Sequence, residues 1–225
     1  MRFDKYEGIT EEVQSVLFFG DWHAINSLKL AGHINEGFAY LLDGHPLVFP
    51  VDENTPPEVP RFIFRSQDES VVLQLGPQRA TLIERLPTQL GADDVVEGLA
   101  NMLADEFAFS LNRLGRVIRF SVNLDKCATT FLRERYLGPG VVDHPAQANV
   151  QWLTKKPLGE ETVNQWTMLD SASESPGTGL RILIDTNLLE DADRRVSKDS
   201  VREFFRNASE DTMSVIEGIL QEGLR

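Results

Sequence analysis

Cysteine, long apolar runs and clustered histidines are what this sequence has least of. Its one cysteine, Cys127, excludes an internal disulfide and a cysteine-based zinc cluster. No apolar stretch approaches the ~20 residues that a membrane-spanning helix needs. The charged N-terminus, MRFDKYEGITEE, has no signal-peptide core. These absences predict a cytoplasmic protein that folds without a disulfide or a metal.

Motifs for catalysis or cofactor binding are also missing. The chain has no nucleophile elbow, no phosphate-binding Gly-rich loop and no dinucleotide fingerprint. His23, His33, His45 and His144 have no metal-ligand spacing, so we expect them on the surface or in loops. Cys127, with no histidine near it in sequence, is expected to be a small buried apolar group. The sequence thus predicts no catalytic residues, no metal and no cofactor, and favours a protein that is not an enzyme.

Positive charge is the other deficit. The 225 residues hold 35 acids and 22 bases, a formal net charge of −13. Residues 1–110 carry 18 acids and 7 bases, and residues 111–225 carry 17 acids and 15 bases. Such a surface repels phosphate, which makes direct nucleic-acid binding unfavourable. The charge serves solubility, or it forms a docking surface for a basic protein partner that includes Asp52, Glu53 and Glu58.

One segment reverses this sign. Between residues 113 and 135 six bases face two acids. The bases are Arg113, Arg116, Arg119, Lys126, Arg133 and Arg135. If Arg119 lies on a strand and Arg133 and Arg135 lie on a helix, these residues need not share a face, so a solvated surface is favoured over an anion-binding site.

Apolar periodicity predicts strands and helices in alternation. The expected strands are 13–20, 61–66, 71–76, 80–85, 116–124, 149–158, 164–172 and 180–189. The expected helices run from Asp21 to about Gly37, from Asp93 or Asp94 to Phe107, and from Ser197 or Ser200 to near the C-terminus. A proline-rich stretch, 43–60, is expected to be irregular.

This order predicts an α+β protein with two similar halves, 1–125 and 126–225. Each half is expected to hold an antiparallel meander of three to four strands followed by an amphipathic helix. The halves either join into one curved sheet with helices on one side, as a continuous domain, or stand as two lobes.

Asp185 ends an apolar strand, LRILIDTNLL, that resembles the opening strand of a PIN-type ribonuclease. In that family such an aspartate binds magnesium, but further acids follow it over a long stretch of chain. Only 40 residues follow Asp185 here. A strand end with a solvated turn is therefore the favoured interpretation, and the nearby acids lack the glycine and spacing of an EF-hand loop.

Several segments together resemble a known family. They are the early strand Val13 to Phe19, the Pro60-Arg61-Phe62 segment, the QLGPQ run at 74–78, the Arg-flanked strand at 116–123 and a terminal helix around Phe204. The order of these segments is similar to that in a sporadically distributed family of prokaryotic proteins with no established activity. The resemblance implies no catalytic residue or cofactor. Such a distribution is typical of defence and toxin–antitoxin genes and favours a partner-binding role.

Three functions remain open on this evidence. The first is a non-enzymatic protein-binding module, such as an accessory, antitoxin, immunity or defence-system subunit. The second is an enzyme or a small anionic-ligand-binding protein with its site between the halves, where Arg61, Arg65 and Arg119 would converge. The third is a nucleic-acid mimic. A homodimer is compatible with each.

Overall fold

The computed structural model describes residues 2–3, 6–20, 27–49, 56, 59–87, 93–138, 147–171, 177–191 and 194–221. Its helices are α1 (Ser27–Gly37), α2 (Asp93–Phe107), α3 (Ala128–Leu132) and α4 (Lys198–Gln221), and a π-helical turn, η1 (Arg133–Leu137), follows α3. Its strands are β1 (Arg2–Phe3), β2 (Tyr6–Phe19), β3 (Leu47–Val48), β4 (Phe62–Arg65), β5 (Val71–Leu75), β6 (Arg79–Arg85), β7 (Leu111–Asn123), β8 (Asn149–Leu158), β9 (Glu161–Ser171) and β10 (Gly179–Leu188). The predicted α+β class is confirmed.

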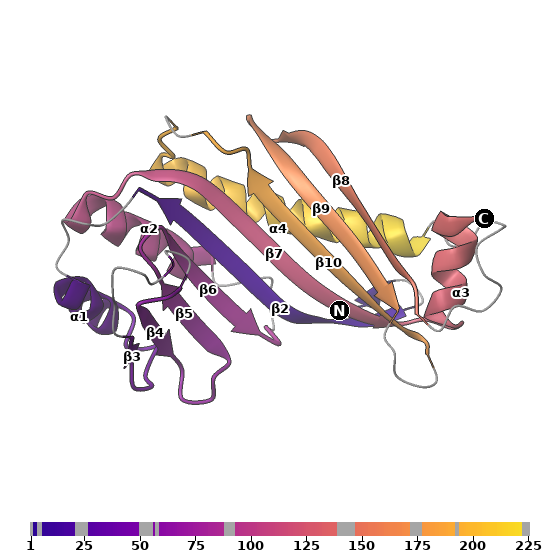
Figure 1. The fold of residues 1–225 in the computed structure, drawn as a ribbon, viewed down its shortest axis with the longest axis horizontal. Coiled ribbons are helices and arrows are strands. Elements are labelled where there is room, and N and C mark those ends of the chain that lie inside the picture. Colours follow the sequence, from indigo (N-terminus) through magenta and orange to yellow (C-terminus); the bar gives the residue numbers. More distant parts are fainter. Residues whose placement is uncertain are drawn as a thin grey trace.

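The strands form one antiparallel sheet in the order β3-β4-β5-β6-β2-β7-β10-β9-β8, and β1 pairs with β2. The long strands β2 and β7 run side by side through its middle (Figure 1). The β4–β5–β6 meander lies on one side of them and the β8–β9–β10 meander on the other. The predicted antiparallel meanders are therefore confirmed, whereas the division into two similar halves stays a prediction.

The strand register assigns each side chain to a face of the sheet, because directly opposed residues point to the same side. Arg116 of β7 lies opposite Ser15 of β2 and Thr186 of β10. Arg119, three residues further along β7, points to the other side. We call the face of Arg116 the covered face and the face of Arg119 the open face.

Helices α2 and α4 contact the covered face. Asp93, the first residue of α2, forms an ion pair with Arg116 at 3.1 Å. The Arg116 guanidinium also lies 5.5 Å from the ring centre of Phe205 on α4. In Figure 1 both helices lie behind the sheet, which turns its open face to the viewer. The side chains of this buried face hold the core.

A polar row divides that core into two apolar clusters. Along β10, Ile184 belongs to one cluster and Leu188 to the other, and the buried Thr186 stands between them. Gln165 of β9 donates through Nε2 to Thr186 Oγ1 at 3.0 Å and to Asp211 of α4 at 2.6 Å. These hydrogen bonds fix α4 at one position over the sheet, because a shift of α4 would leave buried polar atoms unpaired.

Most predicted elements are present, with different limits. Strand β2 begins at Tyr6 rather than at residue 13, because the acids of its first half lie on the open side and pair with β7, as Glu12 does with Arg119. Helix α4 begins after Ser197, whose Oγ accepts a hydrogen bond from the backbone N–H of Ser200 at 3.2 Å. Ser197 is therefore the capping residue. Helix α3 was not among the predicted helices.

Candidate functional site: the open face of the sheet

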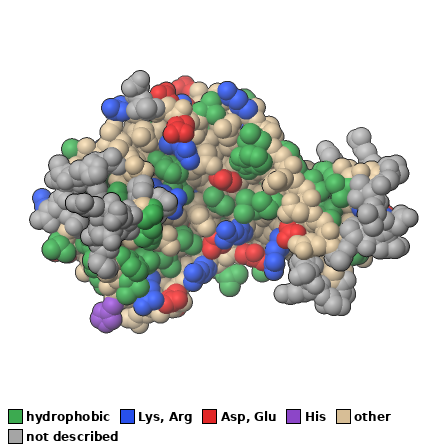
Figure 2. Space-filling model, viewed as in Figure 1, with side chains coloured by type: hydrophobic (Ala, Val, Ile, Leu, Met, Phe, Trp, Pro, Cys, Tyr) green, Lys and Arg blue, Asp and Glu red, His purple; other side chains and the backbone are tan. Residues whose placement is uncertain are grey.

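Large apolar side chains lie on the open face where solvent reaches them. Trp166 of β9 and Leu153 of β8 are opposed in register and are 45% and 49% exposed. Next to them, Met168 of β9 lies opposite Leu183 of β10, and both are half-buried. Figure 2 shows apolar side chains gathered over the middle of this face. Exposed apolar area of this kind, with polar residues around it, is typical of protein interaction sites.

Charged side chains alternate with this apolar area, and bases outnumber acids. The basic positions of the face are Arg65, Arg79, Arg85, Arg113, Arg119, Lys155 and Arg181, and the acidic ones are Glu7, Glu11, Glu12, Asp170 and Asp185. This excess is notable in a chain of net charge −13. The surplus acids of the protein therefore lie outside these positions.

The predicted convergence of Arg61, Arg65 and Arg119 is not seen. Arg61 precedes β4 and is buried. Arg65, on β4, pairs with Glu69 at 2.6 Å, and Arg119, on β7, pairs with Glu12. Strands β5, β6 and β2 lie between β4 and β7. Neighbouring strands are about 4.8 Å apart, so Arg65 and Arg119 are too distant to share a small anion.

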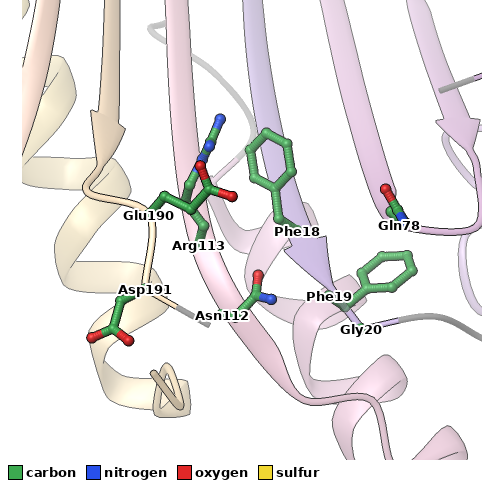
Figure 3. A pocket seen from close by; sticks show the side chains of 8 residues that line it. All are labelled: Phe18, Phe19, Gly20, Gln78, Asn112, Arg113, Glu190 and Asp191. Carbon is green, nitrogen blue, oxygen red and sulfur yellow. The ribbon is translucent and has the colours of Figure 1, made fainter. Parts of the chain in front are cut away.

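A cavity of about 310 Å³ lies where β2 ends and β7 begins (Figure 3). Its lining residues are Phe18, Phe19, Gly20, Gln78, Asn112, Arg113, Glu190 and Asp191. The Arg113 guanidinium lies 4.2 Å from the centre of the Phe18 ring. Within the described part of the chain, its buried Nε has no hydrogen-bond partner. Carboxylates share the cavity with this one arginine, so the cavity does not favour an anion.

Asp185 lies on the open face near this cavity. Burial raises the pKa of its carboxyl group, whereas a hydrogen bond from Asn187 and the charge of Arg113 lower that pKa. Among the residues described, no group of three or more His, Cys, Asp or Glu side chains is arranged to hold a metal ion. Asp185 is thus placed as a strand residue beside an arginine.

A second cavity, of about 280 Å³, lies at the opposite end of the central strands. Glu7, Glu11, Ser121 and Arg181 are among the residues that line it. The Ser121 hydroxyl donates a hydrogen bond to Glu11. Both cavities therefore open at the ends of the same central strands, and each brings an arginine together with two carboxylates.

The basic segment 113–135 is not a uniform solvated surface, contrary to our prediction. Arg116 is fully buried, and its Nη1 donates to Ser15 Oγ at 2.6 Å. Burial raises the pKa of Asp93, and the nearby Arg116 charge opposes that rise. This ion pair holds the start of α2 on β7, so Arg116 has a structural role. Sequence could not show it, because a buried arginine and an exposed one occur three residues apart in one strand.

Of the remaining residues predicted as site residues or histidines, some lie within the described part of the chain and others do not. Asp52, Glu53 and Glu58 lie outside the described residues, as do His23 and His144. His45 is exposed in a loop, and His33 of α1 pairs with Glu106.

Cys127 is exposed, which makes the prediction of a buried apolar group wrong. It precedes α3, and a hydrogen bond from the backbone N–H of Thr130 lowers the pKa of its thiol. Cys127 lies in the loop just before the short helix α3. Its side chain is therefore not part of the buried face of a strand or helix.

Sequence reasoning did not identify Trp166 and Leu153 as exposed apolar residues of a candidate site. The signal was present: the β9 sequence places apolar side chains on both faces, with Trp166 and Met168 alternating with Thr167 and the buried Leu169. Apolar residues on both sides of a strand indicate that both faces of the sheet make apolar contacts.

No protein-family model matches the chain, and the comparison with curated proteins finds no match either. Within the described residues, none of the helices is long and apolar enough to cross a membrane.

Proposed function

We propose that the protein is a non-enzymatic protein-binding module whose docking surface is the open face of the sheet. The observation that carries this proposal is the pair Trp166 and Leu153, opposed on neighbouring strands and about half exposed. A folded chain gains stability by burying such side chains. Their exposure on a face that also carries spaced arginines fits an interface with an apolar centre and a polar rim.

The placement of the helices supports this proposal. Buried residues of all four helices belong to the apolar clusters of the covered face: Leu30 of α1, Leu99 of α2, Phe131 of α3 and Phe205 of α4. The proposal thus includes the predicted layout with helices on one side, and on the other side a sheet face that is exposed at Leu153 and Trp166 of β8 and β9. Its two-halves form is supported by the chain order, in which a long strand, a helix, a meander and a helix occur twice.

The chemistry of the face specifies the partner. Arg85, Arg119 and Arg181 are exposed there, so a partner with an apolar segment flanked by carboxylates is complementary to it. The basic partner expected from the net charge would instead use the acidic residues around 52–58. In either form we propose an accessory, antitoxin, immunity or defence-system subunit of the prokaryotic cytoplasm, in keeping with the family resemblance.

The test is quantitative capture from the native host with nuclease-treated lysate. Tagged wild-type protein is compared with the double variant Trp166→Glu/Leu153→Glu, and bound proteins are measured by mass spectrometry. A stoichiometric partner should fall at least about tenfold in the double variant, since burying two carboxylates in an apolar contact is strongly unfavourable. The purified partner is then titrated against both proteins.

Leu28→Glu is the matched control, because Leu28 of α1 is 72% exposed and is not on the sheet. It should capture the partner as the wild type does. A triple reversal, Asp52→Lys/Glu53→Lys/Glu58→Lys, separates the acidic surface from the open face: it should slow association and flatten its salt dependence only if the partner is basic. Equal capture by wild type and the double variant would contradict the proposal.

The alternative function, an enzyme or a small-ligand-binding protein, has a distinct signature. A chain that binds no protein but retains a small molecule through purification would favour it. The cavity beside Arg113 is the candidate binding site for such a molecule. Arg113→Ala should then release the molecule.

A further inference from the structure

Strand β8 forms one edge of the sheet. It is ten residues long, and within the described part of the chain it pairs with β9 alone. The other edge, β3, has two residues. An exposed edge strand presents free backbone N–H and C=O groups that another strand can bind, and short edges avoid this. The length of β8 makes it the edge where a further strand can add.

The register shows which backbone groups of β8 point away from β9. The carbonyl of Ala148 accepts a hydrogen bond from the Ser171 N–H of β9 at 3.0 Å. Because backbone groups alternate in direction along an antiparallel strand, even-numbered residues of β8 point toward β9 and odd-numbered ones point outward. Pro157 is odd-numbered, so its missing N–H lies on the outer side, where proline is tolerated. Asn149, Gln151, Leu153 and Lys155 therefore hold the outward N–H groups.

Charge is confined to one end of this edge. Residues 149–154, NVQWLT, carry none, and Lys155 and Lys156 follow. Lys156 is already paired with Asp211 at 2.6 Å. Lysines and proline protect the end of the strand from adding a further strand, whereas the uncharged part has no such protection.

We infer that β8 pairs antiparallel with β8 of a second copy of this chain, centred on Trp152 facing Trp152. In this register Gln151 lies opposite Leu153 of the second copy, and their outward backbone groups bond to each other. Lys155 lies opposite Asn149 of the second copy. The sheet then continues through the dimer, and the two open faces lie on the same side.

Two features make the edge complementary to itself. Asn149 lies opposite Asp170 on β9, and both are on the open side. Asn149 of the second copy would thus lie between Lys155 of the first copy and Asp170 of the second, and symmetry repeats this arrangement at the other end of the interface. The Lys155 side chains of the two copies would not lie near each other. Trp152, which stacks on Tyr136 at 5.7 Å, would meet its equivalent at a position without backbone hydrogen bonds, where cross-strand side chains are closest.

The first test is the oligomeric state of the purified full chain by sedimentation velocity at micromolar concentrations. We expect twice the 25.3 kDa chain mass. Gln151→Pro removes an outward N–H and leaves the β8–β9 ladder intact, so it should give a folded monomer. Gln151→Ala keeps that N–H and should remain dimeric. A wild type that stays monomeric, or a Gln151→Pro variant as dimeric as Gln151→Ala, would overturn the inference.

The second test reads the register. In a Cys127→Ser background, Trp152→Cys should form an intermolecular disulfide under mild oxidation, whereas Leu153→Cys should not, because its opposite residue is Gln151. Cross-linking at 153 instead of 152 would overturn the proposed register. No partner protein enters either measurement, so the result is independent of the proposed docking function.

Discussion

Arg116 and Arg119 stand three residues apart on β7, and both form an ion pair, yet they belong to different environments. Arg116 is fully buried on the covered face, bound to Asp93 and Ser15. The Arg119 side chain is 45% exposed on the open face, next to Glu12. The two arginines show that the two faces of one sheet differ in burial. The covered face carries the buried core, and the open face is the surface that we propose for docking.

The largest expected effect tests this contrast directly. Arg116→Ala leaves Asp93 without its partner charge in a half-buried site, so it should lower the free energy of unfolding by about 3–5 kcal/mol. Arg119→Ala should cost less than about 1 kcal/mol, because an exposed ion pair contributes little. Urea denaturation of both variants measures the difference, and equal losses would contradict the assignment of the faces.

Two adjacent apolar residues of β10, Leu183 and Ile184, also lie on opposite faces of the sheet. Ile184 is completely buried on the covered face. Its replacement by alanine should cost about 2–5 kcal/mol, through lost burial and a cavity. Leu183→Ala, on the open face, should cost clearly less in the same denaturation experiment. A larger loss at 183 than at 184 would mean that the open face is covered in the folded chain.

The cap of α4 tests how the covering helix is held. Ser197→Ala removes the acceptor of the Ser200 N–H and should lower the free energy of unfolding by about 1 kcal/mol. Ser200→Ala keeps that acceptor and should have the smaller effect. Thermal denaturation followed by circular dichroism distinguishes them, and the reverse order would place the cap at Ser200, three residues into the helix.

The smallest effect concerns the titration of Asp185. Burial raises its pKa in the folded state above the ordinary value of 3.8. Folding is therefore favoured by this group below that value, and the contribution is lost as pH rises through the folded-state pKa. Asp185→Asn should raise Tm at neutral pH and leave it nearly unchanged at about pH 3. A Tm that falls at neutral pH would show that pairing with Arg113 outweighs burial.

Much of the fold could be predicted because its elements follow local rules. The alternation in 61–66 and 80–85 and the apolar stripe of 93–107 match β4, β6 and α2. The element boundaries that were predicted wrongly are set by contacts with residues distant in sequence. The acidic start of β2 becomes a strand only because β7 supplies Arg119 and Ser121 as partners more than 100 positions away.

The site was less predictable for the same reason. Which face a strand residue occupies is set by register, and burial is set by where the helices lie, so sequence could not separate Arg116 from Arg119. Trp166 and Leu153 are 13 residues apart in sequence, and they become neighbours only through the β8–β9 pairing. The arginines chosen from sequence lie on strands that the topology keeps apart.

Hydroxyl-radical footprinting tests the central claim most directly. The protein is purified from its native host together with whatever it binds, and oxidation of Trp166 is compared with that of the recombinant chain alone. We predict several-fold slower oxidation of Trp166 in the host-purified sample, and unchanged oxidation of Tyr40, which is 75% exposed and off the sheet. Equal oxidation of Trp166 in both samples, with a protein partner bound, would contradict docking on the open face.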